Sequence, residues 1–408
     1  MKILLSAYAC EPGRGSEPGV GWSVARELSS RVDLTVVTRS NNRVPIEECG
    51  ADWVLRVQWV YWDPPAWITR MKVGAIGVQW FYLLWQVMVH RAVRDRLDVE
   101  EFDVVHHLTF GKYWVPSSLW KLKRPFVFGP VGGGEYSPPS LAADLPLRAR
   151  TIDWLKESIQ RLLKTLPFGR GMCRNLSWAF AATKMTEQKL RRQGVEKVSV
   201  LRQSGISKEE LAELGDCDSS KSPNTFHMIT ASRLIHWKAI DLAIKAVALL
   251  VDEFDVKLEI LQEGPERGRL ENLAESLGVS DRVLFLGKLP SREDVFRRIA
   301  ASDCLVHPAL HEAFGQSCLE SMALGTPVVC LDWGGPGLIV DELTGIAVPP
   351  KGLEDTVQGL AASLRLLHQE KVRGETRAEA CRDRARCVFS WSELVDELCS
   401  KYEEVADS

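Results

Sequence analysis

Residues 2–38 read KILLSAYACEPGRGSEPGVGWSVARELSSRVDLTVVT. The apolar run KILLSAYA has the length of a strand, and it is followed by a glycine-containing turn, a helical stretch GWSVARELSS and a second apolar run, DLTVVT. A strand, a helix and a strand in this order form a βαβ unit, in which the strands are parallel and the helix covers the sheet. The stretch therefore predicts an α/β fold.

The same pattern continues along the chain and restarts after residue 224. Strands are predicted at DVVHHL and PFVFG, and then at TFHMITAS, KLEILQE, RVLFLG, DCLVHP and PVVCLD. Between the two groups, residues 205–224 are rich in Asp, Ser, Pro and Asn and are predicted to form a linker. Because 408 residues exceed what one hydrophobic core usually serves, we expect two doubly wound parallel-sheet domains that face a cleft.

Composition excludes several protein classes. With 45% hydrophobic and 26% charged residues, the chain is neither disordered nor collagen-like. The ten cysteines are scattered and never form a CxxC motif, which indicates reduced thiols in a cytosolic protein without a zinc site or a disulfide framework. The apolar run in MKILLSAYACEPG is too short for a signal peptide, so we interpret it as a strand.

Charge is distributed unevenly between the two halves of the chain. Residues 1–200 carry 28 Lys and Arg against 19 Asp and Glu, whereas residues 201–408 carry 23 against 35. Eleven of the 14 tryptophans also lie before residue 200. A basic run is most often a solvated face, and the alternative is a surface for anionic lipid or an anionic substrate. The run consists of Arg148, Arg150, Lys156, Arg161, Lys164, Arg170 and Arg174.

Two basic residues follow the first strand of the second domain. In TASRLIHWKAIDLAIKA, Arg233 and Lys238 stand between the strand FHMIT and an amphipathic helix that begins near Ala239. Ligands of open parallel sheets bind outside the carboxyl ends of the strands, where these side chains are expected. A guanidinium and an ammonium group can together neutralise a diphosphate, although taken alone they also suit a solvated surface pair.

Two glutamates, Glu312 and Glu320, stand eight positions apart in HEAFGQSCLESMALG, after the predicted strand CLVHP. We expect a helix from about Gln316 to Leu324, and its apolar residues indicate that it is partly buried. A carboxylate would repel a phosphate, so each glutamate is predicted to accept hydrogen bonds from hydroxyl groups instead. The backbone amides at the start of this helix can bind a phosphate or sugar oxygen, and they belong to Ala313, Phe314 and Gly315.

These motifs resemble those of the retaining GT-B glycosyltransferases of family 4, the glycosyl transferases group 1. The stretches ASRLIHWK and LEILQEGPERGRLENLAESLGVSDRVLFLG and the pair of glutamates stand in the family's order within residues 224–350. The resemblance implies two Rossmann-like domains and transfer of a sugar, with retention, from a nucleoside-diphosphate sugar to an acceptor hydroxyl. It further implies an acceptor-side domain at 1–205, a nucleotide-sugar-binding domain at 206–385 and a C-terminal helix at 386–408 that crosses back to the first domain.

The resemblance also implies roles for single residues. Arg233 and Lys238 would contact the diphosphate and Glu312 the donor sugar, as the catalytic residues, and Glu320 would contact the ribose. Ser232 and Ala239 stand where the family commonly has glycine, which leaves the loop conformation open. The further donor-binding residues would be Ala313, Phe314, Gly315, Leu319, Gly19, Gly21, Gly287, Lys288 and Leu289.

Candidates for the acceptor side lie in the first domain. The histidine that many relatives place after a later strand is replaced here by FGPVGGGEY, in which Gly133 and Glu135 could contact the acceptor. His107, at the end of DVVHH, is a further candidate. A plain turn and a structural histidine are the alternatives. The pair Asp216 and Asp218 resembles a metal-binding triplet but lies in the predicted linker, so we expect no metal.

Residues 73–89, VGAIGVQWFYLLWQVMV, have nearly the length of a membrane span. Gln79, Gln86 and His90 share one helical face, opposite an apolar face that contains Trp80 and Trp85. We therefore predict a helix packed on the first sheet. The alternative is a helix in the membrane interface, with its aromatic side inward.

The expected activity is thus metal-independent glycosyl transfer without a cofactor, in glycan, polysaccharide or glycolipid assembly. The partners would be a nucleoside-diphosphate sugar and a glycan or lipid-linked acceptor, with peripheral membrane contact and no nucleic acid. The expected location is the cytoplasm or the inner face of the membrane. Two alternatives are a nucleotide-sugar epimerase of the same fold, which would need no acceptor, and a catalytically silent sugar-nucleotide binding protein.

Overall fold

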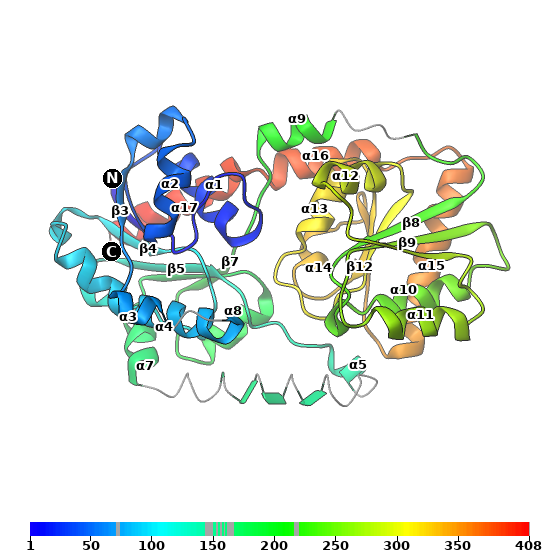
Figure 1. Cartoon of the computed structure of the whole chain (residues 1–408), viewed down its shortest axis with the longest axis horizontal. Coiled ribbons are helices and arrows are strands. Elements are labelled where there is room, and N and C mark those ends of the chain that lie inside the picture. The colour runs from blue at the N-terminus through cyan, green and yellow to red at the C-terminus, as the bar shows by residue number, and fades with distance from the viewer. Residues whose placement is uncertain are drawn as a thin grey trace. The chain divides into compact units, whose positions relative to one another are not determined.

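The computed structural model describes residues 1–70, 74–142, 150–151, 154–155, 157–158, 160, 167–215 and 220–407. The chain forms two compact units (Figure 1): residues 1–134, 155–205 and 391–408 make the first, and residues 135–154 and 206–390 make the second. Each unit contains one parallel sheet with helices on both faces, which confirms the predicted α/β class with two doubly wound parallel-sheet domains. Several residues named above lie outside the described ranges: Arg148, Lys156, Arg161, Lys164, Asp216 and Asp218.

The first unit has a sheet of seven parallel strands in the order β3-β2-β1-β4-β5-β6-β7. Neighbouring residues of its strands point into different cores, since Leu4 packs in one cluster and Ile3 and Leu5 pack in another. Its strands are β1 (Lys2–Ser6), β2 (Asp33–Thr38), β3 (Gln58–Tyr61), β4 (Val104–His107), β5 (Phe126–Val131), β6 (Trp178–Ala181) and β7 (Val198–Val200).

Helices cover both faces of this sheet (Figure 1). One core holds residues of α1, α2 and α17, and the other holds residues of α4, α7 and α8. Each strand is therefore apolar on both sides, as a doubly covered parallel sheet requires. The helices are α1 (Ser16–Leu28), α2 (Arg43–Glu47), α3 (Ala66–Thr69), α4 (Gly74–Arg94), α7 (Pro167–Arg174), α8 (Lys184–Arg191) and α17 (Trp391–Ala406).

Helix α4 packs on the first sheet, as predicted, but not with the predicted division of faces. Phe81 and Trp85 are buried in the core, which rules out the alternative of an aromatic face directed into a membrane. Gln86 and His90 are also buried, although they were assigned to the polar face. Trp80 is 57% exposed, although it was assigned to the apolar face. Among the described residues, no helix is long and apolar enough to cross a membrane.

Helix α17 completes the core of the first unit, although it is the last element of the chain. Trp391, Leu394 and Leu398 pack with residues of β1 and β2. The hydroxyl of Tyr402 lies 2.6 Å from Nδ1 of the buried His106 on β4, whose Nε2 lies 2.5 Å from the carbonyl of Gly129. Because a carbonyl only accepts hydrogen bonds, Nε2 carries the proton and Nδ1 accepts from Tyr402.

The second unit has a sheet of six parallel strands in the order β10-β9-β8-β11-β12-β13. Its strands are β8 (Phe226–Ala231), β9 (Val256–Leu261), β10 (Val283–Gly287), β11 (Cys304–His307), β12 (Val328–Leu331) and β13 (Gly345–Val348). Its helices are α5 (Pro139–Ala142), α9 (Lys208–Gly215), α10 (Ile240–Ala248), α11 (Arg267–Ser276), α12 (Arg292–Ala300), α13 (Gln316–Ala323), α14 (Pro336–Ile339), α15 (Leu353–Val372) and α16 (Ala378–Val388).

The predicted linker at 205–224 is partly wrong, because it contains helix α9. Lys, Glu and Leu favour a helix there, and the buried Leu214 packs in a core of the second unit. The Asp, Ser and Pro residues that suggested a linker come after this helix. The composition of the whole stretch therefore concealed a short amphipathic segment.

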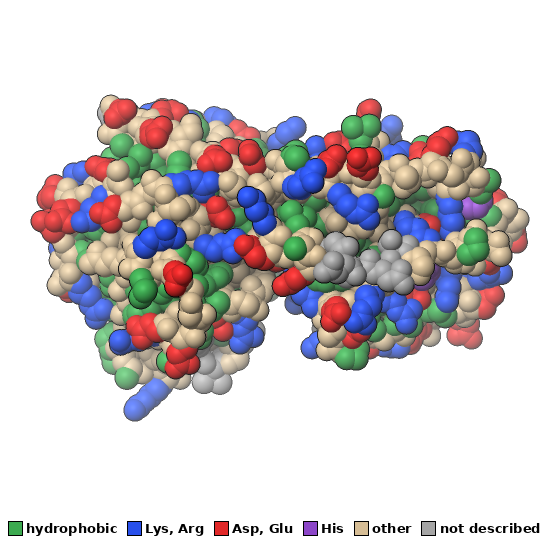
Figure 2. All heavy atoms as spheres, turned by 90° about the horizontal axis from the view of Figure 1, so that it is seen from above, with side chains coloured by type: hydrophobic (Ala, Val, Ile, Leu, Met, Phe, Trp, Pro, Cys, Tyr) green, Lys and Arg blue, Asp and Glu red, His purple; other side chains and the backbone are tan. Residues whose placement is uncertain are grey.

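The surface of the molecule carries basic and acidic side chains side by side. On the face that Figure 2 shows, Lys and Arg intermingle with Asp and Glu over both units. The charge difference between the two halves of the sequence therefore does not produce a face of a single sign in this view.

Candidate functional site

The predicted residues of the second unit gather where its strand order reverses. The chain runs from β8 outward to β9 and β10 and then returns to β11, which pairs with β8 on its other side. The loops after β8 and β11 are therefore adjacent at the carboxyl edge of the sheet, where doubly wound sheets bind their ligands. Arg233 and Lys238 lie in the first loop, and Glu312 lies in the second.

Three titratable side chains meet at this point. The ammonium group of Lys238 donates a hydrogen bond to Oε2 of Glu312. Nε2 of His307, the last residue of β11, lies 3.5 Å from the same oxygen. His307 is only 2% exposed, and its Nδ1 lies 3.4 Å from the hydroxyl of Ser317. The carboxylate of Glu312 thus lies between a cation from one loop and an imidazole from the strand.

Burial alone would raise the pKa of Glu312, but His307 and Lys238 together outweigh it and lower this pKa to about 2. Glu312 is therefore ionised at neutral pH. Burial also lowers the pKa of His307, which keeps its ring neutral. A neutral imidazole beside an ionised carboxylate can donate one hydrogen bond to it without adding a charge.

Glycine-like backbone conformations shape both loops. Ala239, which stands where glycine is common in the resembled family, has φ 47° and ψ 40°, in the left-handed region. Gly315, directly before α13, has φ 98°. A Cβ atom there would lie 3.1 Å from Cγ of Pro336. The chain therefore keeps the family's loop conformation at Ala239 without its glycine.

Glu320 is held by a residue that sequence reasoning did not select. Its Oε1 accepts a hydrogen bond of 2.7 Å from Nη2 of Arg292, at the start of α12. Burial raises the pKa of Glu320, and Arg292 opposes this rise. The predicted ribose contact would have to share the carboxylate with Arg292 or displace it.

The start of α13 leaves backbone donors unused. In the described part of the chain, the amides of Ala313, Phe314 and Gly315 form no hydrogen bond. Arg233 is exposed and forms no ion pair with another described residue. A cation and a set of unpaired amides therefore lie in the two loops that meet at the switch point, which suits an anionic ligand.

The remaining donor-side candidates have more varied surroundings. The side chain of Leu319 is fully buried in the core, so only its backbone is available to a ligand. Gly287, Lys288 and Leu289 follow β10 at the sheet's edge, and Lys288 is exposed. A Cβ atom at Gly287, whose φ is 70°, would lie 2.6 Å from Oε1 of Glu263.

The glycines of the first unit have a local explanation. A Cβ atom at Gly21 would lie 2.1 Å from the carbonyl oxygen of Ala9, and one at Gly19 would lie 2.3 Å from that of Arg14. Both positions are thus closed to side chains by the domain's own backbone. Contact with donor phosphates remains a prediction for both.

The three acceptor-side candidates do not form a cluster. Gly133, with φ 84°, belongs to the first unit, whereas Glu135 groups with the second and is 8% exposed. His107 is fully buried beside Phe128, and neither ring nitrogen has a hydrogen-bond partner. Burial lowers the pKa of His107 to about 3. Its ring therefore has no exposed atom with which to contact an acceptor.

Sequence reasoning also missed the loop after β12. Gly334 and Gly335 pack directly on the Glu312 loop, because the amide of Gly335 donates to the carbonyl of Glu312 at 2.8 Å. A Cβ atom at Gly335 would lie 2.4 Å from Cα of Phe314. Paired glycines after the predicted strand PVVCLD were the available signal. The same rule, a polar residue at a strand's carboxyl end, could have selected His307.

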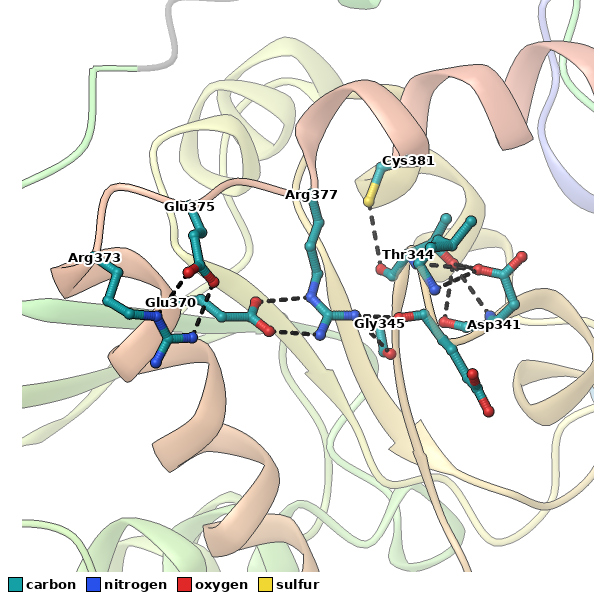
Figure 3. Close-up of polar contacts among 10 residues, drawn as sticks. Asp341, Thr344, Gly345, Glu370, Arg373, Glu375, Arg377 and Cys381 are labelled. Carbon is teal, nitrogen blue, oxygen red and sulfur yellow. Dashed lines mark hydrogen bonds and ion pairs between the residues drawn. The ribbon is translucent and has the colours of Figure 1, made fainter.

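A cavity of about 390 Å³ lies at the opposite edge of this sheet, beside Phe226 and Asp303 at the amino ends of β8 and β11. Its charged residues are largely paired among themselves (Figure 3). Arg377 forms two hydrogen bonds with Glu370, at 2.7 and 2.8 Å, and Arg373 contacts Glu375 at 2.7 Å. These pairs connect α15 to α16, and we interpret the cavity as structural.

Comparison with known proteins agrees with this geometry. Residues 218–385 match the family model described as Glycosyl transferases group 1. A D-inositol 3-phosphate glycosyltransferase of Mycobacteroides abscessus is 36% identical over 134 residues, which are 33% of this chain and 28% of that protein. The chain spans about a third of the length of the curated relatives that it matches.

Two solved structures resemble the whole chain. A sucrose-phosphate synthase from Thermosynechococcus elongatus has a TM-score of 0.65 at 16% identity and covers 100% of both chains. The Anabaena protein Alr3699/HepE, solved in complex with UDP, has a TM-score of 0.61 at 18% identity, over 99% of this chain and 100% of that one. Residues 218–385 thus carry a domain of the glycosyl transferases group 1 family, and the two parallel-sheet units have the fold of GT-B glycosyltransferases.

Proposed function

We propose that the chain is a glycosyltransferase that moves a sugar from a nucleoside-diphosphate sugar to an acceptor hydroxyl, with retention at the anomeric carbon. The observation that carries this proposal is the meeting of Lys238, Glu312 and His307 at the β8/β11 switch point, beside the unpaired amides of residues 313–315. The family match of residues 218–385 supports it. The relative that was solved with UDP supports a nucleotide donor.

In this proposal the positive groups act on the leaving diphosphate. Arg233, Lys238 and the amides before α13 stabilise the charge that develops as the bond to the sugar breaks. Glu312 stays ionised, accepts a hydrogen bond from the donor sugar and orients Lys238. The departing diphosphate takes the acceptor's proton on the same face of the sugar, so no protein base is required.

The acceptor would be a glycan or a lipid-linked sugar, in glycan, polysaccharide or glycolipid assembly. We place the enzyme in the cytoplasm, with peripheral contact at the inner face of the membrane. Contact with a lipid surface is supported by Trp67 and Trp80, which are 66% and 57% exposed in the first unit.

A thermal-shift screen of nucleoside-diphosphate sugars tests the proposal. A true donor should raise the melting temperature by mass action. Lys238→Met should weaken its binding by about tenfold or more, which is about 1.4 kcal/mol. Lys245→Met is the matched control, because Lys245 lies on the adjacent helix α10 and pairs only weakly with Asp241, at 3.4 Å. If no nucleotide sugar shifts the melting temperature, the proposal fails.

Turnover with an acceptor separates this function from its alternatives. An epimerase would convert the donor sugar alone, and a silent binding protein would show no turnover with any acceptor.

Chelation tests the proposed metal independence. We expect activity to survive EDTA, because protein cations and backbone amides meet the diphosphate charge. Loss of turnover on chelation that Mn²⁺ or Mg²⁺ restores would contradict this expectation.

A further inference from the structure

The first unit has a switch point of its own. Strand β1 lies between β2 and β4, because the chain runs outward from β1 through β2 and β3 and then returns at β4. The loops after β1 and β4 are therefore adjacent at the carboxyl edge, where a doubly wound sheet binds ligands. A direct bond joins them, since the amide of Ala9 donates to the hydroxyl of Thr109 at 3.0 Å.

Glu17 lies at this switch point, in the first turn of α1. Its Oε2 accepts a hydrogen bond of 2.8 Å from the amide of Phe110, in the loop after β4. The carbonyl of Phe110 in turn accepts from the hydroxyl of Tyr82 on α4, at 2.5 Å. The carboxylate is thus fixed by residues far from it in the sequence, and one of its oxygens takes no part in this bond.

Glu17 has no cation bound to it. Among the described residues it forms no ion pair, and the nearby ammonium group of Lys112 donates to Oε1 of Gln79 at 2.6 Å. Burial raises the pKa of Glu17, and the Phe110 amide and Lys112 oppose this rise. A half-buried carboxylate without a bound cation costs stability, which is typical of a group kept for binding or catalysis.

We propose that Glu17 binds a hydroxyl group of a polyhydroxylated acceptor, through the carboxylate oxygen that the Phe110 amide leaves unoccupied. A carboxylate accepts strong hydrogen bonds from hydroxyl groups and repels phosphate. The site therefore selects a neutral ring that bears hydroxyl groups rather than a nucleotide. This inference rests on the proposed function, because a glycosyltransferase needs a second substrate with a hydroxyl group.

Saturation-transfer NMR with four probes, glucose, galactose, mannose and myo-inositol, tests the site without any donor. At least one probe should receive saturation from the wild-type protein, and Glu17→Gln should reduce its signal about fivefold or more. Glu11→Gln is the matched control, because Glu11 lies in the same loop but pairs with Arg14 at 3.0 Å. An equal signal in wild type and Glu17→Gln, or no wild-type signal with any probe, overturns the proposal.

The pH dependence gives a readout that a structural role would not produce. The ionised carboxylate is the acceptor of the hydrogen bond, so the wild-type signal should fall as pH drops through the raised pKa of Glu17, above its usual 4.5. Glu17→Gln should show no such step. A step of the same size in Glu17→Gln overturns the proposal.

The variants also report on folding. Glu17→Gln removes an unpaired charge, so its melting temperature should equal or exceed that of the wild type. If it does not fold, Glu17→Asp keeps the charge but moves the carboxylate back, and it should lower the probe signal in the same way. An unchanged signal in Glu17→Asp then overturns the proposal.

Failure of this inference and failure of the proposed function give different results. If a probe binds and depends on Glu17 while no nucleoside-diphosphate sugar shifts the melting temperature, the hydroxyl site stands and the proposed function fails. If nucleotide sugars bind while the probes ignore Glu17→Gln, the proposed function stands and the role of Glu17 is wrong.

Discussion

At the scale of single residues, the two glutamates of HEAFGQSCLESMALG have different partners. Glu312 is bonded to Lys238 and lies near His307, whereas Glu320 is bonded to Arg292. The pKa of Glu312 is lowered and that of Glu320 is raised, so the two carboxylates differ in charge state as well as in place. The structure therefore supports separate roles for them.

Replacing each glutamate by glutamine should separate these roles. Glu320→Gln should weaken binding of the sugar nucleotide and of the free nucleoside diphosphate alike, by about tenfold, because the ribose is common to both. Glu312→Gln should spare the free nucleoside diphosphate, since it releases Lys238 for the phosphates, and should weaken the sugar nucleotide. Calorimetry with both ligands measures this. Equal effects of both variants on both ligands would show that the assignment is wrong.

At the scale of elements, close approach explains the glycines of α1. Alanine is normally better than glycine inside a helix by about 1 kcal/mol. Gly21→Ala should nevertheless destabilise the protein by about 2 kcal/mol or more, because its Cβ atom would lie 2.1 Å from the backbone oxygen of Ala9.

Gly268→Ala, in α11, is the control for this prediction, because no atom lies within 4 Å of its added Cβ atom. It should leave stability unchanged or raise it. Chemical unfolding measures both variants, and a stable Gly21→Ala would mean that α1 can move away from the loop.

Helix α17 is attached to β4 by the bond between Tyr402 and His106. Tyr402→Phe should lower the free energy of unfolding by about 1–3 kcal/mol, because it leaves Nδ1 of the buried His106 without a donor. Tyr61→Phe should be nearly neutral, since the buried hydroxyl of Tyr61 has no partner. Urea titration of both variants tests this, and equal effects would contradict it.

At the scale of the whole molecule, the excess of basic residues and tryptophans in residues 1–200 predicts a reversible membrane contact. Each basic residue near an anionic surface contributes about 1 kcal/mol, and salt screens this attraction. Vesicles with anionic lipid should therefore co-sediment with the protein at low salt and release it at high salt.

Replacing both Trp67 and Trp80 by serine should weaken this co-sedimentation severalfold. Leu55→Ser is the control, because Leu55 is 88% exposed in the same unit. Absence of binding at low salt would refute the membrane contact, and binding that persists at high salt would indicate insertion instead.

Much of this protein follows from the sequence by itself. The two parallel-sheet domains, the strands such as β8 and β11, and the helix after Gly315 all follow from local patterns, because the length of an apolar run and the spacing of glycines act over a few residues. The placing of Arg233, Lys238 and Glu312 at strand ends follows in the same way, since a motif after a predicted strand must lie at its carboxyl end.

Only the tertiary structure decided which of these groups touch. The contact of Lys238 with Glu312 depends on β8 pairing with β11, and the bond of Glu17 to Phe110 depends on β1 pairing with β4. The burial of Gln86 and His90, against the helical pattern, likewise depends on what α4 packs against. Strand order and burial are set by contacts between residues far apart in the chain, and a local pattern carries no information about them.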